Sequence, residues 1–162
     1  MVKTKSKKPK SARDPNLTLY METTMKTVGE TCGEIETLLM EMEAISILKD
    51  IDRVSREIDG IAFTVPFKDT FISIRLPFNW KAIQQLAERG KTGYADTEKE
   101  DRARMVAARQ ILRWIESQFA LWQCEMAEVA EIFLPYIVNP KTGQTAYQQI
   151  EADPGLLLGT GK

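Results

Sequence analysis

The chain has 162 residues, of which 43% are hydrophobic, and this is enough for one folded domain with a sizeable core. It contains no histidine, which excludes Cys–His zinc sites, Ser–His–Asp triads and histidine-based nucleases. The net charge of −1 conceals an uneven distribution, because residues 1–13 contain six basic side chains and no acidic one.

The first element is a basic segment with almost no apolar side chain to bury. Its cationic residues are Lys3, Lys5, Lys7, Lys8, Lys10 and Arg13. Without these six, 16 of the 22 basic residues remain against 23 acidic ones, so the rest of the chain carries about −7. Since residues 1–22 have little burial to offset the entropy of ordering, we predict a disordered basic tail. Unopposed positive charge attracts polyanions, so the tail supplies the first candidate contacts to nucleic acid.

From about Thr23, apolar residues recur at spacings of three and four, which predicts an amphipathic helix. The apolar stripe consists of Met25, Val28, Cys32, Ile35, Leu38, Leu39 and Met42. Away from this stripe, Glu30, Glu34 and Glu41 lie within about 40° of one another at 100° per residue. Three carboxylates on one helix face are a candidate docking site for a basic protein.

Residues 44–77 are rich in β-branched and aromatic side chains with a period of two, which predicts a three-stranded antiparallel meander. For the apolar faces of the second and third strands to lie on one side of the sheet, Val65 must oppose Ile72. This register requires a turn of two or four residues within 67–70. The outer face then contains Arg75, which is a further candidate contact to phosphate.

The apolar run within residues 101–123 predicts a long helix whose apolar arc covers roughly 200°, so that both of its sides are covered by protein. The central stripe consists of Met105, Ala108, Leu112, Ile115, Phe119, Trp122 and Met126. The remaining arc contains Arg102, Arg109 and Arg113 within about 40°, with Val106 beside them.

The three aligned arginines have two interpretations. A solvated arc is the commoner one, because a helix covered on two sides must still expose some residues. A row that binds phosphates or acidic groups is the other, because no acidic residue lies between Arg102 and Arg113. Arg104 projects to the edge of the apolar arc, and we predict that its stem is buried.

Other chemistries find little support in the sequence. The acidic residues between 50 and 59 are interrupted by two arginines, so we predict no metal site there. Cys32 and Cys124 are interpreted as small buried hydrophobes, although a single bridge between them is left open. No window of eighteen apolar residues occurs, so no membrane span is expected. We therefore expect no cofactor and no catalytic residue.

These elements predict an α+β fold with an N-terminal helix, a three-stranded antiparallel meander and then two to four helices. One of these later helices is long, central and packed on the sheet. The predicted domain spans residues 23–150, between the basic tail at 1–22 and a flexible C-terminal tail at 151–162.

The stretches "FISIRLPFNWKAIQQLA" and "ARQILRWIESQFALWQCEMAEVAEIFLPYIVNPKTGQTAYQQI" carry a resemblance to a known group. They resemble small proteins of prophages and other mobile elements, in which an FRLP strand end precedes a short helix, a long LRWIEAQLAL-like helix and a VFLPY segment. The similarity covers roughly residues 24–150. It implies a viral or mobile-element context and the host cytoplasm, but it transfers no functional residue.

The leading hypothesis is a non-enzymatic, nucleic-acid-associated accessory protein whose basic tail contacts phosphates, with the arginine row or Arg75 extending the contact. The alternative is an inhibitor or adaptor of host machinery that binds a basic host protein through the acidic face of the first helix. The sequence also leaves open whether a second copy covers the exposed edge of the sheet.

Overall fold

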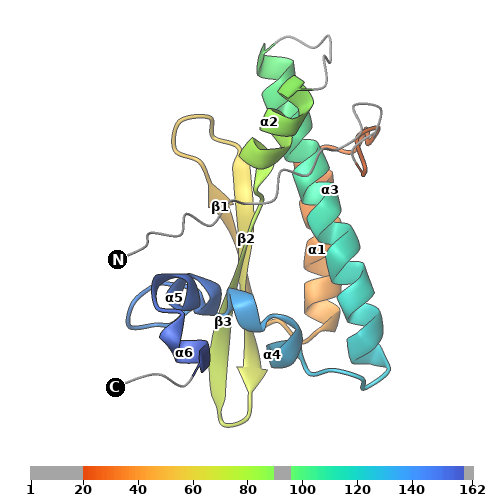
Figure 1. Ribbon diagram of the computed structural model, residues 1–162. Helices are drawn as coiled ribbons and strands as arrows, with labels where there is room; N and C mark the ends of the chain where they lie inside the picture. Colours follow the sequence, from red (N-terminus) through yellow and green to blue (C-terminus); the bar gives the residue numbers. More distant parts are fainter. Residues whose placement is uncertain (1–19, 90–95, 159–162) are drawn as a thin grey trace, which may run out of the picture.

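In a computed structural model of the chain, the described residues are 20–89 and 96–158. Within them a helix precedes one three-stranded sheet, and a series of helices follows it (Figure 1). The first elements are α1 (Val28–Glu41), β1 (Ser46–Ile51), β2 (Ile58–Phe67) and β3 (Thr70–Pro77). The later ones are α2 (Trp80–Arg89), α3 (Asp96–Gln123), α4 (Val129–Ile132), the 3-10 turn η1 (Leu134–Tyr136), α5 (Ala146–Ala152) and α6 (Gly155–Leu158). The predicted α+β class and the order of elements are confirmed.

Helix α1 begins at Val28, later than the start near Thr23 that the apolar periodicity predicted. A capping box fixes this boundary. The hydroxyl of Thr27 accepts a hydrogen bond from the Glu30 N–H at 3.2 Å, and the Glu30 carboxylate accepts one from the Thr27 N–H at 2.8 Å. Met25, which was predicted in the apolar stripe, therefore precedes the helix and is exposed.

The sheet has the strand order β1-β2-β3 and is antiparallel throughout. The predicted register is confirmed, because Val65 opposes Ile72. Phe67 pairs with Thr70, so the chain adopts the two-residue form of the turn. Lys68, the first residue of this turn, has a φ of 52°, which lies in the left-handed region.

A register shift interrupts the pairing of β1 with β2 between Asp50 and Ile51. Gly60 of β2 lies next to this shift, opposite Asp50 on one side and Pro77 on the other. A Cβ atom at Gly60 would lie 2.8 Å from the carbonyl oxygen of Leu76. Only glycine fits this close approach of the two backbones.

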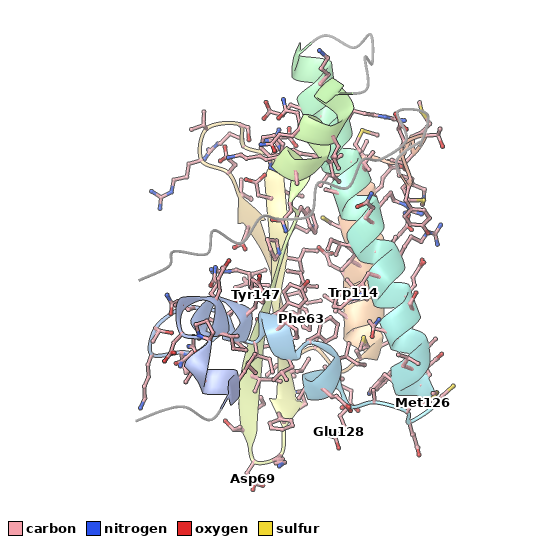
Figure 2. All side chains as sticks on the ribbon, viewed as in Figure 1. Phe63, Asp69, Trp114, Met126, Glu128 and Tyr147 are labelled. Carbon is pink, nitrogen blue, oxygen red and sulfur yellow. The ribbon has the colours of Figure 1, made fainter. Side chains whose placement is uncertain are left out.

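The inner face of the sheet packs against α1 and α3 (Figure 1). Aromatic rings connect the two layers. Phe63 of β2 meets Phe133 edge-on with ring centroids 5.2 Å apart, and Phe133 meets Trp114 of α3 at 5.4 Å (Figure 2). Leu112 and Ile115 of α3 are buried in the same core, which confirms that α3 is an interior helix.

The exposed arc of α3 is smaller than the sequence predicted. Val106 and Arg109 were both placed on that arc, and both are buried because α1 packs along this side of α3. At the other end of the helix the apolar stripe ends early. Phe119 is only partly buried, and Met126 lies beyond the last residue of α3 and is exposed (Figure 2).

The two outer edges of the sheet differ. Along β3, the Val138 N–H donates to the Ser73 carbonyl at 2.8 Å, and Ile137 forms an antiparallel bridge with Ile74. The segment after η1 thus covers the outer edge of β3. Strand β1 pairs only with β2 among the strands of the described residues, so its outer edge has no partner strand there.

Candidate functional site

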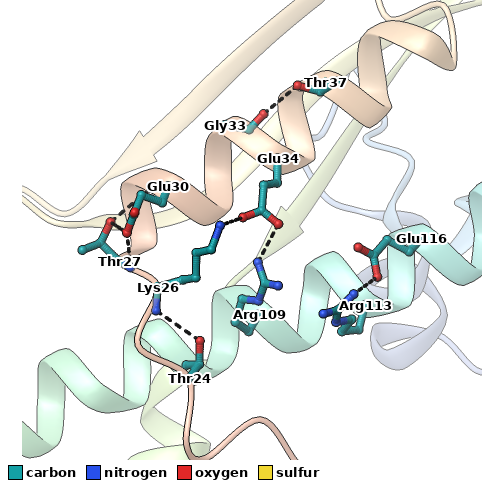
Figure 3. Close-up of polar contacts among 10 residues, drawn as sticks. All are labelled: Thr24, Lys26, Thr27, Glu30, Gly33, Glu34, Thr37, Arg109, Arg113 and Glu116. Atoms are coloured by element: carbon teal, nitrogen blue, oxygen red, sulfur yellow. Dashed lines mark hydrogen bonds and ion pairs between the residues drawn. The ribbon is translucent and has the colours of Figure 1, made fainter.

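Arg109 and Glu34 belong to different predicted interfaces, yet they bind each other between α3 and α1 (Figure 3). Arg109 Nη1 donates to Glu34 Oε2 at 2.7 Å, and Lys26 Nζ donates to Glu34 Oε1 at 2.7 Å. These hydrogen bonds, the one from Lys26 first, lower the pKa of Glu34. The Arg109 side chain is 8% exposed and that of Glu34 is 35% exposed. The pair is therefore a contact within the fold.

The other two predicted protein-binding carboxylates of α1 differ from each other. Glu30 belongs to the capping box, and the backbone N–H and hydroxyl of Thr27 lower the pKa of Glu30 by donating to its carboxylate. Glu41 lies at the last residue of α1 and is exposed. The predicted acidic face is thus divided between an exposed helix-capping carboxylate at Glu30, an interhelical ion pair at Glu34 and an exposed side chain at Glu41.

The predicted arginine row is divided in the same way. Arg102 donates to the backbone carbonyls of Glu22 and Thr24, and it thereby fastens the segment before α1 to α3. Arg113 pairs with Glu116 one turn along the same helix, at 2.6 Å, and is partly exposed. With Arg109 enclosed, the row does not form one surface.

Arg104 is more deeply engaged than the sequence suggested. Its burial was predicted and is confirmed, and its guanidinium lies 4.1 Å from the ring centroid of Trp80. Its Nη1 is 2.6 Å from Glu100 and its Nε is 3.5 Å from Asp59, which also accepts a hydrogen bond from Trp80 Nε1 at 2.9 Å. This cluster joins α3, α2 and the start of β2, and it leaves neither the ring nor the guanidinium available to a ligand.

Three of the four acidic residues between 50 and 59, namely Asp50, Asp52 and Asp59, have separate partners. Asp52 accepts hydrogen bonds from the backbone N–H groups of Val54 and Ser55, at 2.9 and 2.7 Å, and so orders the turn between β1 and β2. Asp50 lies 3.4 Å from Arg75. In residues 20–89 and 96–158 there is no group of three or more His, Cys, Asp or Glu side chains that could hold a metal ion.

The two cysteines are both free, which answers the question that the sequence left open. Cys32 is buried as predicted, and burial raises the pKa of its thiol to about 11. Cys124 was also predicted to be buried, but it follows the last residue of α3 and is exposed. The apolar stripe of α3 is only partly buried at this end of the helix, so Cys124 is exposed and the prediction was wrong.

Arg75 and the basic tail remain as candidate phosphate contacts. Arg75 lies on the outer face of the sheet with half of its side chain exposed, and its contact with Asp50 is a long one. The basic residues of the tail, Lys3 to Arg13, lie outside the residues that the structure describes.

The sequence reasoning missed three exposed apolar residues on and beside the edge strand β1. Ile45, Leu48 and Ile51 are 60%, 64% and 56% exposed. The signal was present in "SILKDI", because Ile47 and Leu48 are adjacent in a strand and therefore point to opposite faces. A strand with one buried face buries an apolar side chain at only one of these two positions, so the other apolar side chain is exposed.

Comparison of the chain with protein-family models, with curated proteins and with solved structures gives no match. Across the described ranges, no helix has both the length and the apolar character that crossing a bilayer requires. Function is therefore inferred from the charges and surfaces of this chain alone.

Proposed function

We propose that the protein is a non-enzymatic accessory protein of a phage or mobile element that binds nucleic acid in the host cytoplasm, without sequence preference, through its basic tail. Six positive charges within residues 3–13 support this, because they have no acidic neighbour in that segment. Each cation that neutralises a phosphate releases a condensed counterion, so such a tail binds polyanions with strong dependence on salt.

The internal contacts of the folded domain strengthen the role of the tail. Arg102, Arg104 and Arg109 are bonded to groups of the domain itself. The chain outside the tail carries an excess of negative charge, which disfavours close contact with a duplex. Arg75 also has a partner in the domain, Asp50 at 3.4 Å, but half of its side chain is exposed, so it extends the contact where a strand of nucleic acid passes the outer face.

The alternative, in which α1 binds a basic host protein, is less well supported. Two of its three carboxylates, Glu30 and Glu34, already accept hydrogen bonds within the chain. Glu30 is exposed as well, but its carboxylate is held in the helix cap, and the one further exposed charge, Glu41, contributes little to affinity.

The test is a titration of labelled single- and double-stranded DNA and RNA, followed by fluorescence anisotropy at two ionic strengths. We expect binding by the full chain that weakens about tenfold or more when salt rises from 50 to 200 mM, and little binding by a variant that lacks residues 1–13. Replacing the six basic tail residues with glutamine keeps the length of the tail and should have the same effect.

Arg75→Gln is the matched control in the folded domain. It should weaken binding by much less than the tail variants, because it removes one phosphate contact out of several. Equal affinity of the full chain and the tail-deleted chain would contradict the proposal. So would affinity that is independent of salt.

A further inference from the structure

Three exposed apolar residues lie along the β1 edge of the sheet, which has no partner strand within the described residues. Ile45, Leu48 and Ile51 occur within or next to β1, and all three are more than half exposed. Edge strands are normally protected by charges, bulges or a covering segment, because their free backbone groups pair readily with another strand. The edge of β3 has such a covering segment, whereas the edge of β1 has none among the residues described.

The backbone groups at the open edge follow from the pairing of the sheet. The Ser73 carbonyl accepts a hydrogen bond from Val138, away from β2, so Thr64 opposite it directs its own backbone groups to β1. Ser46, opposite Thr64, therefore directs its groups to β2. Because these directions alternate along a strand, Ile47 and Lys49 present their N–H and C=O groups at the open edge.

We propose that a second copy of this chain binds there, with β1 pairing antiparallel to β1 of the second copy around a two-fold axis at Leu48. The two sheets then form one continuous sheet of six strands. Ile47 of each copy exchanges backbone hydrogen bonds with Lys49 of the other. This interface is isologous, which is the commonest arrangement in homodimers.

The positions of the side chains select this register. Centred on Leu48, the pairing places Leu48 beside its counterpart on the outer face and Ile45 beside Ile51, so each exposed apolar residue lies beside another apolar residue. Centred on Lys49, it would oppose two like charges. Centred on Ile47, it would place Ile45 beside Lys49 and Leu48 beside the polar Ser46. Only the first register gives all three exposed apolar residues an apolar partner.

Charge at the two ends of the strand agrees with the same register. Glu43 precedes β1, Arg53 follows it, and both are exposed. Glu43 lies in the turn before β1, with a φ of 66°, and Arg53 lies in the turn after β1. The pairing centred on Leu48 therefore places the turn with Glu43 of one copy near the turn with Arg53 of the other, at each end of the interface. Lys49 keeps its existing partner, Glu36 of α1, at 2.6 Å. The second copy therefore meets opposite charge at both ends, and the apolar pairs Leu48–Leu48 and Ile45–Ile51 lie between them.

Sedimentation velocity of the full chain over a roughly hundredfold range of concentration tests the proposal. We expect a concentration-dependent dimer, and Leu48→Lys should raise its dissociation constant about a hundredfold or more because it places two cations together at the axis. Met126→Lys is the matched control, because Met126 is 70% exposed beyond the end of α3, away from β1, and its replacement should leave the dimer unchanged. Far-UV circular dichroism verifies that both variants are folded.

Two further variants test the register. Glu43→Arg and Arg53→Glu should each weaken the dimer, and the double exchange should restore it. In a Cys124→Ser background, Leu48→Cys should form a disulfide-linked dimer under mild oxidation, since opposed residues at such a position have Cα atoms about 4.5 Å apart. Val54→Cys in the same background should not form one.

A monomer at every concentration would overturn the proposal. A dimer that Leu48→Lys leaves unchanged would also overturn it. The dimer does not depend on nucleic acid, so failure of this test leaves the proposed function intact, and a protein that fails to bind nucleic acid can still form the dimer.

Discussion

The α1–α3 contact and the open edge of β1 distribute their polar and apolar groups in opposite ways. Between α1 and α3, charged side chains that the sequence marks as surface are enclosed and bonded to one another, as in the Arg109–Glu34 pair. At β1, apolar side chains that would normally be enclosed are exposed. The first region has its partners within the chain, and the second has none among the described residues.

A row of aligned charges on a helix is therefore not by itself a binding surface. Arg109 on α3 and Glu34 on α1 were each interpreted as part of an interface, and each is a partner for the other. A charged residue of an interior helix often marks the neighbour that covers it, whereas an uncovered apolar strand is the stronger sign of a partner outside the chain.

The largest effect should come from the apolar side of the α1–α3 layer. Ile35→Ala deletes most of a fully buried side chain and should lower the free energy of unfolding by about 2–5 kcal/mol, because the cavity left in a packed core closes only in part. Urea unfolding followed by circular dichroism measures the change. Val54→Ala at the other region should stay within about 0.5 kcal/mol, since Val54 has almost no contact to lose.

The contribution of the Arg109–Glu34 ion pair to the free energy of unfolding should depend on pH. The pKa of Glu34 is lowered in the folded protein, so its stabilising effect is fully present above the ordinary glutamate pKa and is lost as pH falls through the lower, folded value. Glu34→Gln should therefore reduce stability at pH 7, by about 1–2 kcal/mol given its partial exposure. The deficit should disappear in acid.

Thermal unfolding of this variant and the wild-type protein from pH 7 down to pH 2 measures that difference. Glu41→Gln is the matched control, because it makes the same substitution at an exposed position of α1. A deficit that stays constant over the whole pH range would mean that the charge of Glu34 contributes nothing to stability.

The smallest effect is expected in chemical labelling of the two thiols, which tests whether the α1–α3 layer protects Cys32 from solvent. Cys32 is buried with its pKa raised to about 11, and Cys124 is exposed. A disulfide reagent at pH 8 should therefore modify one thiol per native chain rapidly and the second only on unfolding, because the thiolate is the reacting form. Rapid reaction of both thiols in the native protein would show that this layer opens readily.

The parts of the fold that were predictable depend on periodicity within one segment. Alternation in β2 and β3 was sufficient to set the Val65–Ile72 register, and the stripe through Leu112 and Ile115 identified α3 as interior. Both patterns are local, because each residue's environment follows from its own position in a strand or helix.

The fate of the charged residues predicted as interfaces on α1 and α3 was less predictable, because it depends on how the two helices are rotated against each other. A helical wheel gives the polar arc of α1 and the polar arc of α3, but it does not say that Glu34 faces Arg109. Phe133, which links the sheet to α3, lies in a short irregular segment without periodicity. The start of α1 was missed because the Thr27–Glu30 capping box overrides the apolar spacing that includes Met25.

The close approach at Gly60 limits how far this chain can diverge in sequence. Any larger residue would force the backbone of β2 away from Leu76, so lineages of this protein should keep glycine there even when the surrounding strands drift. Gly33 of α1 is the opposite case, because a methyl group added there meets nothing within 4 Å. Natural variation at these two glycines should therefore differ widely, with Gly33 free to become alanine.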